Sequence, residues 1–247
     1  MTSHETIAKA LAKVNALREA QVVAPRLGDA VIQIKQLQAR RFEGTYRDLL
    51  RSEDFGDAAR FFLTELYAAK DYSARDQQFS RIAKTIEKVF PASVIQTATQ
   101  MASVHCLTEE LDQAMGACWL EQPLDRDPVS RYIDCWRFVG ARHERSTQLL
   151  GVLKLGKDLT QLTNTVGLST LLKLMRRPAH LAGLESLQTF LETGFETFKT
   201  MSRCNDSTGA GYFLNQVRDR EEAWITRFFD GPTDEVTSSL RHCLANT

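Results

Sequence analysis

His105, Glu109 and Asp112 are the residues whose types and spacing best suit a chemical role in this sequence. In an α-helix they follow one another at intervals of four and three residues, so their side chains lie on one face. An imidazole and two carboxylates are ligands that zinc, manganese or iron accept when another helix completes the set. Candidate ligands on other helices are Glu65, Glu221 and Glu222. The same spacing also suits a buried histidine bonded to a carboxylate, or a surface ion pair.

Haem is a second cofactor that the composition could accommodate. His105 and His180 are the histidines that could ligate its iron inside a bundle rich in aromatic residues. The chain has 13 Phe, 5 Tyr and 3 Trp, but aromatic side chains at helical spacing also form ordinary core packing. His143 lies in a charged run with Glu144 and Arg145, and we expect it at the surface. We expect no obligatory cofactor and keep a metal or haem site near His105 as the alternative.

Two familiar kinds of catalytic site are not supported. Residues 151–158 resemble a phosphate-binding loop, but Asp158 replaces the hydroxyl residue that would bind magnesium, and the intervening residues favour a helix. No GxSxG sequence marks a nucleophilic serine. Cys106 is adjacent to His105, but neighbouring residues on a helix point about 100° apart and do not form a working pair.

The composition limits which cellular compartment and which classes of binding partner we expect for this protein. The 31 basic and 31 acidic residues give no formal net charge, so the basic surplus typical of nucleic-acid binders is absent. No apolar run approaches the ~18 residues of a membrane span, and the N-terminus lacks the apolar segment of a signal peptide. Five cysteines at scattered positions argue against a disulfide framework. We therefore expect a cytoplasmic protein that binds neither nucleic acid nor membranes.

The elements that must position these residues are helices throughout. Apolar residues recur at intervals of three and four, and alternation with a period of two is nowhere sustained. The sequence predicts an all-α fold, a bundle of about eight to ten helices, forming a single domain over residues 1–247. A corner at 121–128 could separate two subdomains.

Individual boundaries follow from proline, glycine and polar residues. We expect helix ends near Pro25, Pro91, Gly140 and Gly231, possible breaks at Gly151, Gly156 and Gly167, and a long helix over 92–120. Ser73 and Asp76 fit the start of a helix, where Asp76 would take part in capping and ion pairing. A helix beginning at Pro178 carries a heptad-like apolar seam over 184–201, and 203–211 has the composition of a loop.

One segment resembles a known family. FFLxELY at 61–67 and DxSxRD at 71–76 resemble a family of uncharacterised proteobacterial all-helical proteins, and looser similarity extends through 105–112 and 178–195. Members of that family have Gly-Pro where this chain has Ala68-Ala69. The resemblance implies a bacterial, helical protein and brings no activity with it.

Apolar helix faces without a recognisable catalytic constellation favour a non-enzymatic protein. We expect it to bind a protein partner or a small ligand, and to form a homodimer. The alternative is a helical bundle that binds metal or haem near His105.

Overall fold

The computed structural model describes residues 2–67 and 70–245, and within these residues it contains thirteen α-helices, one π-helical turn and no strand. The all-α prediction is therefore confirmed, with more helices than expected because several are short. The helices are α1 (Ser3–Val23), α2 (Pro25–Thr45), α3 (Arg47–Leu50), α4 (Gly56–Phe62), α5 (Ser73–Val89), α6 (Ala92–Glu121), α7 (Pro128–Val139), α8 (Arg142–Thr163), α9 (Leu168–Leu174), α10 (Arg176–Leu181), α11 (Glu185–Ser207), α12 (Gly209–Asp230) and α13 (Thr233–Ala245). The π-helical turn η1 (Leu63–Tyr67) continues α4. Ala68 and Ala69, where the sequence departs from the family it resembles, lie outside the described residues.

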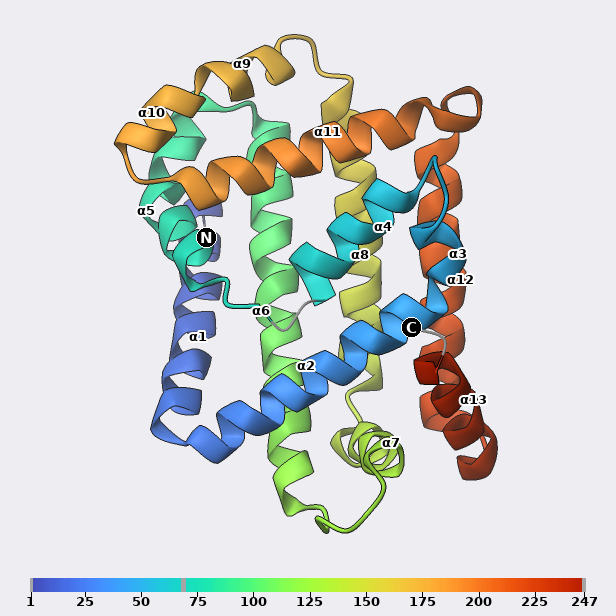
Figure 1. Ribbon diagram of the computed structural model, residues 1–247. Helices are drawn as coiled ribbons and strands as arrows, with labels where there is room; N and C mark the ends of the chain where they lie inside the picture. The colour runs from blue at the N-terminus through green and yellow to red at the C-terminus, as the bar shows by residue number, and fades with distance from the viewer. Residues whose placement is uncertain (1, 68–69, 246–247) are drawn as a thin grey trace.

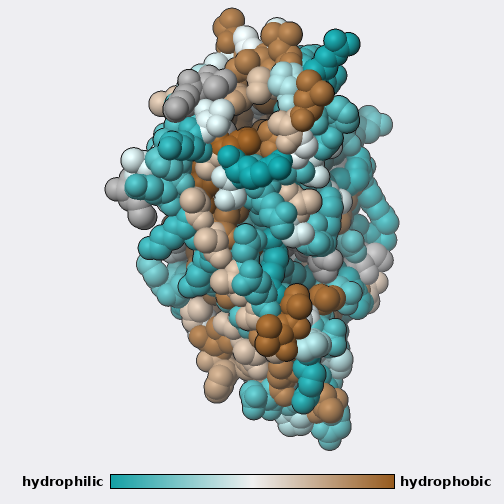
Figure 2. Space-filling model, turned by 90° about the vertical axis from the view of Figure 1, so that its left-hand side faces the viewer, coloured by the Kyte–Doolittle hydropathy of each residue, from teal (hydrophilic) through white to brown (hydrophobic). Residues whose placement is uncertain are grey.

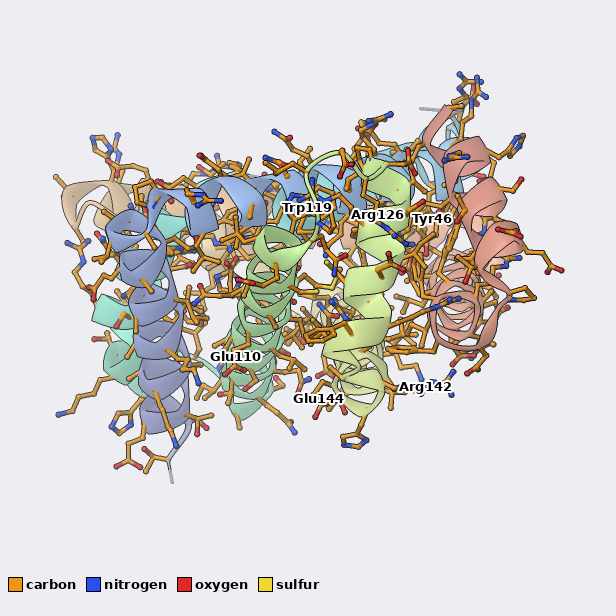
Figure 3. The ribbon with its side chains drawn as sticks, turned by 90° about the horizontal axis from the view of Figure 1, so that it is seen from below. Tyr46, Glu110, Trp119, Arg126, Arg142 and Glu144 are labelled. Atoms are coloured by element: carbon orange, nitrogen blue, oxygen red, sulfur yellow. The ribbon has the colours of Figure 1, made fainter. Side chains whose placement is uncertain are left out.

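The longer helices form two layers (Figure 1). α1, α6, α8 and α12 stand side by side in one layer, and α2 and α11 cross in front of them with α4 between. The view from below in Figure 3 shows α2 crossing one side of the layer that contains α1 and α6. Glu110, labelled there on α6, is paired with Lys13 of α1 at 2.7 Å. The space between the two layers is where the buried polar residues described below meet.

Several helix ends follow directly from the local sequence. Pro25 occupies the first turn of α2, where its missing N–H costs no hydrogen bond. The Asp127 carboxylate caps α7 by accepting a hydrogen bond from the backbone N–H of Ser130 at 3.0 Å. Gly140, with φ of 68°, ends α7, as its position in the sequence predicts. The corner at 121–128 joins α6 to α7.

The predicted breaks at Gly151 and Gly156 are wrong, because α8 runs through both without interruption. These glycines serve close packing. A Cβ atom at Gly151 would lie 2.6 Å from Val104 Cγ2, and one at Gly156 would lie 2.4 Å from Leu214 Cδ2. Glycine here lets α6 and α12 approach α8 closely, which composition alone does not distinguish from a break.

Two further boundaries differ from prediction in the C-terminal half. The helix expected from Pro178 onward is divided into α10 and α11, and Gly183 adopts a φ of 63° between them. The loop expected over 203–211 is wrong, because α11 extends to Ser207 and α12 begins at Gly209. At Gly209 a Cβ atom would lie 2.3 Å from the Met201 carbonyl oxygen, so glycine allows a tight reversal between two helices.

The heptad-like seam of α11 faces the interior of its own chain. Leu187, Phe198 and Met201 are fully buried against other helices of the bundle. Gly194 completes this face, and a Cβ atom there would lie 3.0 Å from Phe61 Cζ. This seam is therefore used for internal packing.

The surface is largely polar. Figure 2 shows the side that carries α1 and α5, where most residues are hydrophilic and hydrophobic ones gather at the upper end and in the lower part. Among the described helices, none combines the length and the apolar character needed to cross a membrane.

Candidate functional site

A cavity of about 100 Å³ lies between the two layers and is lined mainly by polar side chains. We call it the polar chamber. Its charged lining comprises four cations and four carboxylates, contributed by α2, η1, α5, α6, α8 and α12, with His105 beside them. The charged residues are Lys35, Arg41, Arg75, Arg145, Glu65, Glu109, Asp112 and Glu221. Because buried charges are costly unless they are paired, each pair in this chamber has a structural consequence.

α2 and α6 meet through two polar pairs. The Lys35 Nζ atom lies 2.7 and 2.8 Å from the two carboxylate oxygens of Glu109. One turn further along both helices, Gln38 Nε2 donates to Asp112 Oδ1 at 2.9 Å. Burial raises the pKa of the Asp112 carboxyl, and the nearby Lys35 charge only partly opposes this effect. Glu109 and Asp112 therefore have different roles, one as an ion-pair partner and the other as a buried hydrogen-bond acceptor.

α2 is joined to α12 by a bidentate ion pair. Arg41 donates from Nη1 and Nη2 to the Glu221 carboxylate at 3.0 and 2.8 Å, and Tyr46 Oη donates to the same carboxylate at 2.9 Å. Arg41 is 4% exposed and Glu221 is 7% exposed. The planar fork of an arginine matches a carboxylate geometrically, so this pair fixes how the two helices are aligned.

His105 belongs to a buried chain of polar groups that reaches α1 and α5. Its Nε2 atom lies 2.8 Å from Asp76 Oδ2, which also accepts a hydrogen bond from Arg18 Nη2 at 2.6 Å. Burial opposes ionisation of Asp76, but the hydrogen bond and charge interaction with His105, the charge of Arg75 and the Arg18 hydrogen bond outweigh it and lower the pKa of Asp76 to about 2. An ionised carboxylate only accepts hydrogen bonds, so Nε2 of His105 carries the proton. In the neutral ring, Nδ1 is then the acceptor.

Arg75 occupies the boundary between polar and apolar surroundings. Its guanidinium carbon lies 4.3 Å from the centre of the Tyr72 ring and 4.7 Å from that of Phe190, so both rings pack on it. The Arg75 Nε atom reaches Asp76 at 3.4 Å, and Nη1 is 3.6 Å from the nearer Glu65 oxygen. Buried Nη1 has no hydrogen-bond partner within the described part of the chain. The guanidinium is thus held in place by rings while one of its donor atoms stays unbonded.

Two further hydrogen-bond donors of the polar chamber lie on α7 and are also buried. Tyr132 Oη and Trp136 Nε1 are buried and, apart from each other, meet no hydrogen-bond partner among the described residues. They lie one helical turn apart, and the Arg145 guanidinium carbon lies 4.2 Å from the centre of the Trp136 ring. Arg75 Nη1, Tyr132 Oη and Trp136 Nε1 can all donate a hydrogen bond. A guest that carries acceptor oxygen atoms would satisfy them.

A second cavity, of about 160 Å³, adjoins the first. We call it the apolar chamber, because its lining is almost entirely hydrocarbon, supplied by α4, α5, α6 and α8–α11. The two chambers share four lining residues: Met101, Val152, Leu155 and Phe190. Of these, Met101 is unbranched and flexible, so the boundary between the chambers can change shape at low cost.

The residues predicted to hold a metal line the polar chamber but are engaged separately. His105 is bonded to Asp76, Glu109 to Lys35 and Asp112 to Gln38. Across residues 2–67 and 70–245, no group of three or more His, Cys, Asp or Glu side chains is placed to hold a metal ion. The metal site stays a prediction, and binding would require these pairs to separate.

The other candidate ligands lie elsewhere or are already paired. Glu65 and Glu221 line the polar chamber, but Glu222 is exposed. His180 is also exposed and pairs with Glu185 at 2.8 Å, and His143 is exposed as expected. Both chambers are smaller than the roughly 300–1,000 Å³ typical of sites for drug-sized ligands. A haem, which stays an untested alternative, would need more room than either chamber has.

Residues 17–235 match the family described as a domain of unknown function, DUF8198. The chain belongs to this family. The match spans α2 to α12 in full and therefore includes every residue that lines either chamber. Neither the curated proteins nor the solved structures compared with this chain match it.

In this member of DUF8198, the sequence did not reveal most of the residues that form ion pairs or hydrogen bonds with the candidate site residues. Arg18, Lys35 and Arg41 each lie on a helix with alternating charges, and nothing local distinguishes them from surface residues. Asp76 and Arg75 fall within the DxSxRD segment that the sequence resemblance marked, which was the available indication of a special role. Asp76 lies in the first turn of α5 and forms ion pairs, as predicted, but its partner Arg18 and its hydrogen bond with His105 come from other helices.

Proposed function

We propose that this chain is a non-enzymatic helical protein that binds a small molecule of mixed polarity between its two helix layers. The observation that carries the proposal is the adjacency of the two chambers, one polar and one apolar, with four shared lining residues. Ligand sites in proteins are mostly apolar concavities with a few well-placed polar groups, and this arrangement fits that description.

The energetic cost of the apolar chamber supports this use. Cavities in protein cores cost about 24 cal/mol per Å³, so a void of 160 Å³ costs about 4 kcal/mol relative to a filled core. This is a large share of the roughly 5–15 kcal/mol by which proteins are stable. A bound apolar group would recover much of that cost, because it restores the missing contacts.

Among the described residues that line the polar chamber, no catalytic constellation is formed, which favours binding over catalysis. His105, which lines the polar chamber, is already bonded to the Asp76 carboxylate behind it, and no serine or cysteine is among the described residues that line the chamber. A general base needs a reacting group within hydrogen-bond reach, and the chamber's other polar groups are mostly paired with each other. The expected homodimer and any protein partner stay predictions, which light scattering on the purified protein would test.

Native mass spectrometry on freshly purified, untagged protein tests the proposal directly, with a visible absorption spectrum of the same sample. We expect a mass excess that disappears on denaturation and matches an organic molecule of a few hundred daltons or less. An excess equal to a metal ion or haem would instead favour the alternative that the sequence suggested. A bare chain that also binds nothing from a broad library of small molecules would refute the proposal.

A chamber-filling substitution adds a matched comparison. Ala98 on α6 lines the apolar chamber, so Ala98→Leu should occupy part of it and weaken binding without loss of stability. Ala12→Leu on the exposed face of α1 adds the same atoms away from both chambers and should leave binding unchanged. Equal binding by both variants would show that the ligand lies outside the apolar chamber.

A further inference from the structure

The junction between the two chambers carries information about the chemistry of the guest. Phe190 lines both chambers and packs on the Arg75 guanidinium at 4.7 Å. Arg75 therefore lies where the polar surroundings begin, directly beside the hydrocarbon surface. Its side chain is 11% exposed, and its Nη1 atom is buried and without a hydrogen-bond partner among the described side chains and backbone.

The charges around Arg75 restrict which head group can bind there. A guanidinium presents paired N–H donors that match a carboxylate, so an anionic oxygen group is the best partner for its unbonded atom. Glu65 lies 3.6 Å from Nη1 and Asp76 lies 3.4 Å from Nε. These two carboxylates would repel a group with two negative charges, such as a phosphate monoester, more strongly than one with a single charge. A monoanion fits this balance best.

The apolar chamber sets the size of the rest of the guest. Its volume of about 160 Å³ is close to that of engineered protein cavities of about 150 Å³ that bind benzene. A group of six or seven carbon atoms therefore fits. Its lining of Phe, Leu, Ile, Val and Met side chains offers no ion-pair partner and almost no polar atom. A charged or strongly hydrated group would be excluded from this end of the site.

We infer that the guest is an amphipathic monocarboxylate, with its carboxylate on Arg75 and an apolar group of six or seven carbon atoms in the apolar chamber. This inference rests on the proposed function and specifies its ligand class. Arg75 is the head-group residue, and its stacking between Tyr72 and Phe190 keeps the guanidinium oriented before the ligand arrives. Such preorganisation lowers the entropy lost on binding.

The decisive experiment compares three probes of equal chain length on the unaltered protein by isothermal titration calorimetry: octanoate, octan-1-ol and octylamine. We expect octanoate to bind roughly tenfold to a hundredfold more tightly than octan-1-ol, because a hydrogen-bonded ion pair is lost with the alcohol. Octylamine should bind most weakly, because its cation would face Arg75. Since this comparison needs no variant, it does not depend on whether a substituted chain folds.

Substitutions then locate the head group. Arg75→Gln should remove the preference for octanoate over octan-1-ol, and Arg75→Lys should restore part of it. Arg218→Gln, at an exposed position of α12, is the control and should keep the full preference. Ala98→Leu should weaken octanoate and octan-1-ol alike, because it affects the apolar chamber that both would share.

The possible outcomes separate this inference from the proposed function. Equal affinity for octanoate and octan-1-ol, or tighter binding of octylamine, would overturn the carboxylate assignment while small-molecule binding stood. A preference for octanoate that survives Arg75→Gln would overturn the role of Arg75. If none of the three probes binds but native mass spectrometry shows another organic guest, the ligand class is wrong and the proposed function holds.

Discussion

The ion pair between Arg41 and Glu221 allows a quantitative test of how the two helix layers are held together. Both side chains are almost fully buried, and two hydrogen bonds of 3.0 and 2.8 Å join them. Removing one member of such a pair leaves the other charge buried without its main partner, which costs about 3–5 kcal/mol. We expect Glu221→Gln and Arg41→Met each to lower the free energy of unfolding by this amount.

The double variant Arg41→Met/Glu221→Met should be much less damaging than the sum of the single changes. Two apolar side chains of similar length leave no buried charge, and such replacements are often close to neutral. The measurement is urea denaturation of the four proteins at pH 7, analysed as a double-mutant cycle. For a chain of this size, the single variants should melt about 10 °C lower than the parent.

An exposed ion pair provides the control for this cycle. Arg142 and Asp230 are about half exposed, so neutralising either should change stability by no more than about 1 kcal/mol. If the Arg41 and Glu221 changes prove additive, or if each costs as little as the exposed pair, the two groups are not coupled in solution. Either result would refute the conclusion that this ion pair stabilises the packing of α2 against α12.

Three further substitutions, one of them with a matched control, test separate features of the interior. The pKa of Asp76 falls from its ordinary 3.8 to about 2, so the carboxylate contributes stability that is present above pH 4 and lost as the pH falls toward 2. Asp76→Asn should therefore remove about 2 kcal/mol of this stability at pH 7. It should also flatten the acid unfolding curve over that pH window, as followed by circular dichroism. The pKa of Asp112 is raised by burial, which means that ionisation destabilises the fold as the pH rises, so Asp112→Asn should leave stability at pH 8 unchanged or higher in the same assay. Gly44→Ala should prevent folding or lower the free energy of unfolding by more than about 3 kcal/mol, because its Cβ atom would lie 2.0 Å from the Cys243 carbonyl oxygen. The control is Gly211→Ala, whose Cβ atom would meet no atom within 4 Å. It should be neutral or slightly stabilising in urea denaturation.

The sequence predicted the helical class because apolar spacing is a local property that each segment carries by itself. The ends of α2 and α7 were equally accessible, since Pro25 and Gly140 act within one turn. Glycines were wrongly predicted as helix breaks where they allow another helix to pack closely. Gly151 and Gly156 are contacted by Val104 and Leu214, which are distant in the sequence, and no local pattern reveals such contacts.

The candidate site was predicted only in part, for the same physical reason. His105, Glu109 and Asp112 do share a helix face that lines a polar chamber, but their partners come from α2 and α5. Arg145 illustrates the difficulty well: it follows His143 and Glu144 in a charged run, yet it is buried while they are exposed. Charge alone does not show which side of a helix faces a cavity.

The separation of Arg41 and Glu221 along the chain has a consequence for how the protein is made. The two residues are 180 positions apart, and ribosomes add roughly 5–20 residues per second. Arg41 is therefore added to the chain roughly ten to forty seconds before its carboxylate partner. During that interval α2 can pack on α6 through Lys35 and Glu109, which are 74 positions apart, but the wall contributed by α12 is absent. The polar chamber is thus completed only when Glu221 and Ile225 of α12 have been translated, whereas the described lining of the apolar chamber is complete before that helix begins.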